Sequence, residues 1–204
     1  MARTVRIKAG QDLVTGRFEG AGERGVLLAH GAGTDQDHPV IVATRSALAK
    51  GGVRVMTFNY PYSEAGRSRP DSTERLLACH RAALANLQAR CPAGIFLAGR
   101  SMGGRMGTYL AAEGAEVLGV ICYGYPLHPP GRPEQLRIDH LGRIRVPMLF
   151  FQGDRDALSR SDLFDRHVRA LGNVTVVDLK ADHSLGGLKS VDLLARATLS
   201  FILA

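Results

Sequence analysis

The chain has 204 residues, of which 45% are hydrophobic and 22% are charged, and its formal net charge is +7. These values exclude a disordered or fibrous protein and fit one soluble domain, since domains usually span about 100–200 residues. Its apolar runs are far shorter than the ~20 residues of a membrane span, and its first residues do not resemble a signal peptide. We therefore expect a cytoplasmic protein with no membrane partner.

Short β-branched runs alternate with longer helical stretches along the chain. The first two runs are separated by Gly10 and Gln11 and predict an antiparallel hairpin. The later units predict an α/β fold, with a mostly parallel twisted sheet and helices on both faces. Gly51 and Gly52 mark one helix end, as residues with positive φ often do. Strands are expected at 4–9, 13–19, 25–30, 53–59, 94–98, 117–123, 147–152 and 174–179, and helices at 38–50, 71–90, 102–113, 161–171 and 190–203.

No linker or repeat interrupts this order, which predicts one domain over residues 1–204. A hairpin followed by strand and helix units, with glycine turns after the third and fifth strands, is the order of an α/β-hydrolase sheet. The carboxyl ends of the parallel strands then meet at one rim, where we expect the chemistry. Residues 124–146 form a proline-rich connection that is too short for a full helical cap. This connection predicts a minimal cap and an open, shallow site.

The basic residues are scattered along the chain rather than gathered in one segment. Only four of the 26 basic residues are lysine, and the densest local groups are pairs such as Arg67 with Arg69. A nucleic-acid-binding protein more often concentrates its charge in a stripe or tail, so we expect no nucleic-acid partner. The arginines instead favour attraction of anionic substrates. Three cysteines without CxxC spacing indicate neither a disulfide framework nor a metal site.

The central motif is the G-x-S-x-G sequence at residues 99–103, which lies between a predicted strand and a predicted helix. Its glycines suit a sharp turn without room for Cβ atoms, and this turn would push the hydroxyl of Ser101 into the cleft. The sequence HGAG at 30–33 closes the third predicted strand. The N–H groups of Ala32 and Met102 are the expected oxyanion donors, and a turn that needs small residues is the alternative. We expect His30 to be structural.

A serine nucleophile needs a base, and the base needs a carboxylate that holds its tautomer. In this fold the three follow in the order serine, acid, histidine. His183 is the only later histidine directly after the last predicted strand, so it is the expected base. Asp154 and Asp156 both follow a predicted strand end at the same rim, and their spacing does not choose between them. We expect no cofactor and no metal, because the chain has no P-loop, dinucleotide motif or ligand cluster.

The chain resembles the α/β-hydrolase superfamily over essentially its full length. Within it, the chain is similar to the small dienelactone-hydrolase-related hydrolases akin to the testis-expressed and NSL-complex subunit-three hydrolase-like family. This resemblance implies an acid three residues after the strand-end glycine, which is Asp156, with Asp154 in reserve. Dienelactone hydrolases use a cysteine nucleophile where this chain has Ser101, so their substrate is not implied. The resemblance rests on HGAG at 30–33, FNYPY at 58–62, GR at 66–67, PD at 70–71, GRSMGGR at 99–105, GYPLHPPG at 124–131 and HL at 140–141.

These features predict a serine hydrolase that cleaves an ester, thioester or related acyl bond of a small soluble substrate. Esterase, thioesterase and peptidase stay open as alternatives. Tyr60, Tyr62 and Arg67 lie in the loop after the fourth predicted strand and are candidates for lining the substrate pocket. The alternative is that the tyrosines pack on the sheet and the arginine is solvated. Because some relatives serve as scaffolds, a catalytically silent protein-interaction domain is the rival function.

Overall fold

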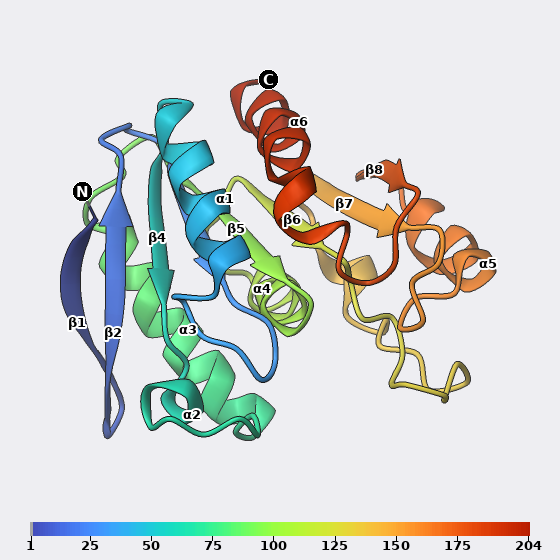
Figure 1. Cartoon of the computed structure of the whole chain (residues 1–204), viewed down its shortest axis with the longest axis horizontal. Coiled ribbons are helices and arrows are strands. Elements are labelled where there is room, and N and C mark those ends of the chain that lie inside the picture. The colour runs from blue at the N-terminus through green and yellow to red at the C-terminus, as the bar shows by residue number, and fades with distance from the viewer. Residues whose placement is uncertain (1) are drawn as a thin grey trace.

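The computed structural model describes residues 2–204, and its strands form one eight-stranded sheet (Figure 1). The strand order is β1-β2-β4-β3-β5-β6-β7-β8; β2 pairs antiparallel with β1 and β4, and the remaining pairs are parallel. The predicted α/β sheet with its N-terminal hairpin is therefore confirmed. The strands are β1 (Arg3–Ala9), β2 (Asp12–Glu19), β3 (Gly25–Ala29), β4 (Arg54–Phe58), β5 (Ile95–Arg100), β6 (Gly119–Tyr123), β7 (Met148–Gly153) and β8 (Val174–Leu179).

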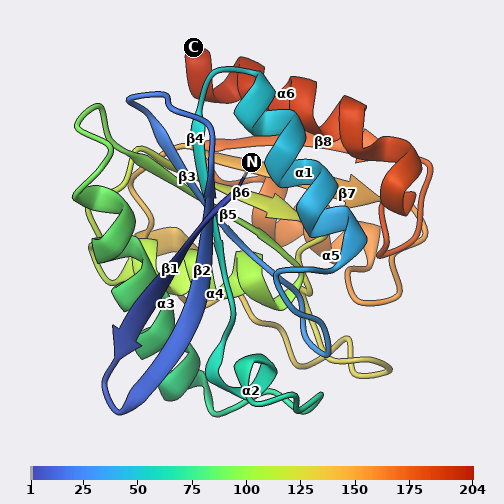
Figure 2. The same ribbon diagram turned by 60° about the vertical axis from the view of Figure 1, so that its left-hand side comes forward.

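Helices cover both faces of this sheet (Figure 2). Helices α1 and α6 pack together on one face, and α3 and α4 pack together on the other. The sheet therefore has a hydrophobic core on each face. Successive side chains of a strand point to opposite faces, so Val26 and Leu28 of β3 join the core under α1 and α6, whereas Leu27 and Ala29 join the core under α3 and α4. The α-helices are α1 (Pro39–Lys50), α2 (Pro61–Glu64), α3 (Thr73–Gln88), α4 (Met102–Ala112), α5 (Ser161–Phe164) and α6 (Val191–Leu203).

Local signals explain where two of these helices begin. The side chain of His38 accepts a hydrogen bond from the N–H of Val40, and Pro39 supplies a first helical residue that needs no hydrogen bond. At the start of α3, the hydroxyl of Ser72 accepts the N–H of Arg75 at 3.4 Å. Each contact satisfies an N–H group that a helix start leaves free.

Two segments differ from the predicted elements. The helix expected at 161–171 is α-helical only over α5, and Asp165–Arg169 continues it as a π-helix. The loop expected after β4 contains α2, which begins at Pro61 because proline holds φ near its helical value.

The connection at 124–146 contains a single 3₁₀ turn, Leu141–Arg143, and another 3₁₀ turn, Gly187–Ser190, precedes α6. The cap is therefore minimal, as predicted.

Candidate active site

Ser101 occupies a strained turn between β5 and α4. Its φ of 49° and ψ of −115° lie outside the regions that residues with a Cβ normally adopt. The glycines beside it make the turn possible. A Cβ at Gly99 would lie 2.3 Å from the carbonyl carbon of Gly103, and a Cβ at Gly103 would lie 2.6 Å from the oxygens of Ala29 and His30. The strand, the turn and the helix are thus too close for any larger residue at either position.

His183 lies in the loop after β8, with its ring directed at Ser101. The Nε2 atom of His183 is 2.8 Å from Oγ of Ser101. Glycines at the ends of two neighbouring strands leave space for this loop. A Cβ at Gly124 would lie 3.1 Å from the His183 oxygen and 3.5 Å from its ring, and a Cβ at Gly153 would lie 2.5 Å from the oxygen of Ala181. The carboxyl ends of β6 and β7 therefore accommodate the histidine loop.

Asp156 is the carboxylate that meets His183. Its Oδ2 lies 2.8 Å from Nδ1 of the ring, and its side chain is fully buried. The other oxygen, Oδ1, accepts the N–H of Leu158 at 2.8 Å. Asp154 is instead half exposed, and its Oδ1 accepts the N–H of Ala181 at 3.0 Å. Of the two aspartates that spacing left open, Asp156 contacts the ring of His183 and Asp154 contacts the backbone of the histidine loop.

Buried polar contacts hold the turn that carries Asp156. The amide of Gln152 donates to the carbonyl oxygen of Ser159 at 3.0 Å, and the Ser159 hydroxyl donates back to Gln152 at 3.1 Å. His128 lies in the connection after β6. Its backbone N–H donates to the carbonyl of Leu158, and its ring Nε2 accepts the backbone N–H of Arg160. The sequence interpretation did not assign these positioning roles, because partners from separate segments leave no local signal.

The histidine loop is also tied to the serine turn. The guanidinium of Arg100 donates to the carbonyl oxygen of Ser184 at 3.2 Å. Burial lowers the pKa of Arg100, and the nearby carboxylates of Asp182 and Asp156 oppose that shift, so the side chain keeps its charge at neutral pH. The Ser184 hydroxyl and N–H lower the pKa of Asp182 by hydrogen bonding to its carboxylate. Both carboxylates therefore favour a cation at this side of the site.

Of the two expected oxyanion donors, Ala32 lies on the HGAG loop that faces Ser101, and Met102 directly follows Ser101 in the chain. A Cβ at Gly31 would be 3.7 Å from Cβ of Ser101, so the HGAG loop passes directly beside the serine. Among residues 2–204, no atom accepts a hydrogen bond from the N–H of Ala32 or of Met102. Met102 is the first residue of α4, where helix N–H groups lack internal partners.

The buried ring of His30 holds the HGAG loop through hydrogen bonds. Its Nδ1 donates to the carbonyl of Gly31 at 2.9 Å, while Nε2 accepts the N–H of Tyr60 at 3.2 Å and lies 3.1 Å from the hydroxyl of Ser63. Burial lowers the pKa of His30 to about 4, so the ring is neutral at physiological pH. A neutral ring with one donor and one acceptor matches these contacts. The structure thus places His30 in a structural position.

Comparison with known proteins places the chain in a family. The family model for an alpha/beta hydrolase domain matches residues 22–202. The chain belongs to this family. Its fold is shared by an esterase from Pyrococcus furiosus (16% identity, TM-score 0.81, covering 100% of this chain and 90% of that one). It is also shared by an alpha/beta serine hydrolase homologue from Coxiella burnetii (18%, 0.76, 99% and 97%) and by an alpha/beta serine hydrolase without a lid from Xanthomonas campestris (18%, 0.75, 97% and 94%).

The two tyrosines proposed to line the substrate pocket of this hydrolase do not reach its surface. Tyr60 and Tyr62 are both fully buried. The hydroxyl of Tyr60 lies 3.0 Å from Nδ1 of His80, and the hydroxyl of Tyr62 donates to the carbonyl of Gly31 at 3.2 Å. The pocket-lining expectation is wrong for both, because their rings pack in the core beneath the HGAG loop. Arg67 is half exposed and binds Asp71 at 2.9 Å.

The three cysteines Cys79, Cys91 and Cys122 are buried and free, and burial raises the pKa of Cys79 to about 12. Over residues 2–204, no set of three or more acidic, histidine or cysteine side chains is arranged to hold a metal ion. No helix in this same part of the chain is both long and apolar enough to cross a membrane.

Proposed function

We propose that this hydrolase cleaves an ester, thioester or related acyl bond of a small soluble substrate through Ser101, His183 and Asp156. One observation carries the proposal, the continuous hydrogen-bond chain in which His183 joins both other residues at 2.8 Å. A carboxylate only accepts hydrogen bonds, so Nδ1 carries the ring proton and Nε2 presents its lone pair to the serine hydroxyl. The ring is then in the tautomer that a general base needs.

In the first half of the reaction, the Ser101 oxygen forms a bond to the acyl carbon while Nε2 of His183 takes the hydroxyl proton. The resulting imidazolium is stabilised by the charge of Asp156. When the tetrahedral intermediate collapses, the bond from the acyl carbon to the leaving oxygen or sulfur breaks. The same proton passes from Nε2 to that leaving atom. The products are an acyl-serine and an alcohol or thiol.

In the second half, water repeats these steps in the opposite direction. His183 takes a proton from water as the water oxygen bonds to the acyl carbon, and it returns that proton to Oγ of Ser101 as the acyl-serine bond breaks. The free N–H groups of Ala32 and Met102 would bind the oxyanion of both intermediates. In other enzymes one such donor contributes roughly 3–4 kcal/mol to transition-state stabilisation.

The short cap supports a small, soluble substrate. The connection at 124–146 contains one 3₁₀ turn and no inserted helical layer, and the similar protein from Xanthomonas campestris is described as lacking a lid. An open site excludes little water and gives a long acyl chain little surface to bury. Hydrolysis rates of p-nitrophenyl acetate, butyrate, octanoate and palmitate test the substrate class; a preference for palmitate would contradict a small, soluble substrate.

We also propose that the chain belongs to the narrower group of dienelactone-hydrolase-related hydrolases.

Labelling with a fluorophosphonate probe tests the nucleophile. The wild type is expected to form a covalent adduct on Ser101, whereas Ser101→Ala and His183→Ala are expected to label at the level of heat-denatured protein. Mass spectrometry of the tryptic peptide identifies the modified residue. A folded wild type that does not label would favour the catalytically silent interaction domain instead.

A further inference from the structure

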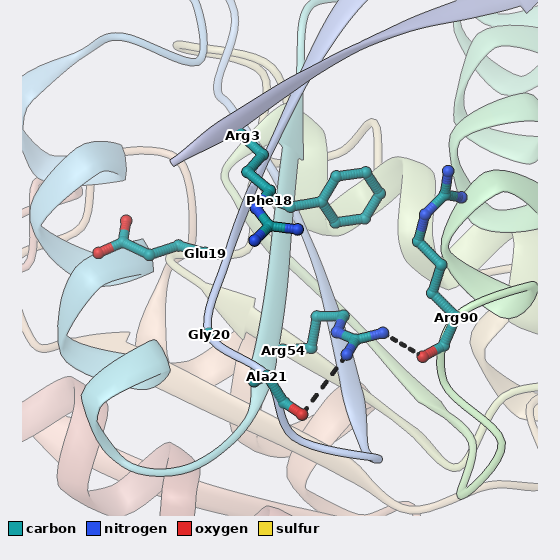
Figure 3. A pocket seen from close by; sticks show the side chains of 7 residues that line it. All are labelled: Arg3, Phe18, Glu19, Gly20, Ala21, Arg54 and Arg90. Atoms are coloured by element: carbon teal, nitrogen blue, oxygen red, sulfur yellow. Dashed lines mark hydrogen bonds between the residues drawn. The ribbon is translucent and has the colours of Figure 1, made fainter. Parts of the chain in front are cut away.

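A cavity lies on the side of the sheet where strands β3, β4 and β5 begin (Figure 3). Its volume of about 470 Å³ is within the range of small-molecule sites. Ser101 follows the other end of β5, and a strand of six residues spans about 20 Å. The cavity is therefore separate from the candidate active site. It is lined by Arg3, Phe18, Glu19, Gly20, Ala21, Arg54 and Arg90.

Three arginines from separate elements meet at this cavity. Arg3 begins β1, Arg54 begins β4 and Arg90 follows α3. In the described part of the chain, none of them forms a salt bridge with an acidic side chain. The one acidic lining residue, Glu19, points away from the arginines in Figure 3 and binds Arg45 at 3.0 Å. The carboxylate of Glu19 is thus paired with Arg45, and the three arginines of the cavity have no acidic partner among the described residues.

Two of the guanidinium groups are held in place and still have donors to spare. Arg54 donates to the carbonyl oxygens of Arg90 and Ala21, as the dashed lines in Figure 3 show. Arg90 donates to the backbone and side-chain oxygens of Asn86, and its Cζ lies 4.9 Å from the ring centre of Phe18. Because a guanidinium carries five N–H donors, each group keeps several for a ligand. Holding the groups in advance lowers the entropy that binding would cost.

We propose that this cavity binds a small molecule that carries both a chain of two or more phosphate groups and a planar ring, as a nucleoside diphosphate or triphosphate does. The fork of a guanidinium matches a pair of phosphate oxygens, and three such groups suit more than one phosphate. The partly buried ring of Phe18 lies among the arginines and offers an apolar surface to the planar ring. The proposal is independent of the reaction at Ser101.

Isothermal titration calorimetry of the full chain with ADP and with inorganic pyrophosphate tests the site. Both ligands are expected to bind, and Arg3→Gln and Arg90→Gln are each expected to weaken binding about tenfold, as for loss of one charge-assisted contact. Arg166→Gln is the matched control. Arg166 is exposed, lies in the π-helix beside β8 at the other end of the strand order, and forms no salt bridge with a described residue. Its loss is expected to change the affinity less than twofold.

Further variants separate the parts of the ligand. Phe18→Leu is expected to weaken ADP binding while pyrophosphate binds as before, and Ser101→Ala is expected to bind both ligands like the wild type. Equal weakening by Arg166→Gln and Arg3→Gln would reduce the site to non-specific charge attraction and overturn the proposal. Absence of binding at millimolar ligand would also overturn it. If Phe18→Leu leaves ADP affinity unchanged, the ring contact is wrong.

Discussion

Oδ2 of Asp156 accepts a hydrogen bond from Nδ1 of His183 at 2.8 Å, although the two residues are 27 positions apart in the chain. The turn after β7 presents the carboxylate and the loop after β8 presents the ring. Since β7 and β8 are neighbours in a parallel sheet, the two loops leave the sheet side by side. The second carboxylate oxygen is held by the N–H of Leu158, so the acid has one orientation toward the ring.

This contact predicts different effects for the two aspartates of the turn. Asp156→Asn is expected to lower kcat by about 10⁴-fold, because an amide in place of the carboxylate no longer holds the catalytic tautomer or stabilises the imidazolium. Asp154→Asn is the matched control and is expected to stay within a few-fold of wild type, since Asp154 contacts only the backbone N–H of Ala181 and the side chain of Arg155. Kinetics with p-nitrophenyl acetate measure both. A larger loss for Asp154→Asn would reverse the assignment.

Gly124→Ala is expected to impair catalysis beyond its effect on folding. The new Cβ would lie 3.1 Å from the oxygen of His183, and small displacements of a catalytic group can cost about 100-fold in rate. Gly131→Ala provides the control, because Gly131 has a similar φ of 68° against 70° but nothing within 4 Å. Both variants are expected to lose about 1–2 kcal/mol of stability through left-handed strain. Only Gly124→Ala should reduce kcat, and an equal reduction in both would contradict the steric argument.

The strained backbone at Ser101 predicts a trade between activity and stability. A residue with a Cβ at this φ and ψ costs about 1–3 kcal/mol, and glycine relieves that cost at the expense of some unfolded-state entropy. Ser101→Gly is therefore expected to be about 1 kcal/mol more stable than Ser101→Ala, with both variants inactive. Urea unfolding monitored by circular dichroism measures the difference. A less stable glycine variant would show that the turn is not strained.

Buried histidines predict acid sensitivity of the fold. Burial lowers the pKa of His80 to about 3 from its ordinary 6.5. Below pH 6.5, His80 is therefore protonated in the unfolded chain but stays neutral in the folded chain. The free energy of unfolding is therefore unaffected by this histidine above pH 6.5 and decreases as the pH is lowered further. The decrease is about 2 kcal/mol per such histidine between pH 7 and pH 5.

The variant His80→Gln tests this effect, because glutamine keeps an acceptor for the Tyr60 hydroxyl but does not titrate. Its free energy of unfolding is expected to fall by about 2 kcal/mol less than that of wild type over the same pH interval. Urea titrations at pH 7, 6 and 5 provide the comparison. The neutral-pH stabilities of both proteins serve as the reference. Parallel pH profiles would show that His80 does not contribute.

Much of the fold was predictable because its signals are local. Alternating and helical apolar periods indicate the strands and helices, and glycines mark turns such as the one around Ser101, where no Cβ fits. The order of the units then limits the sheet to few arrangements, since parallel crossovers are right-handed. The π-helical continuation of α5 and the short helix α2 were not predicted, because each is about one turn long and lacks a periodic pattern.

The sequence by itself determined the strands and the longer helices, the serine turn, the loop that faces this turn and the histidine after the last strand. Residue spacing did not choose between Asp154 and Asp156, although the family resemblance implied Asp156, and the contact of Asp156 with the ring is seen only in the tertiary structure. The tertiary structure also decided that Tyr60 and Tyr62 are buried and that three arginines meet at one cavity. The reason is physical. Backbone preferences are set within a few residues, whereas a contact between side chains depends on strand register and loop path, which are established when distant segments pack together.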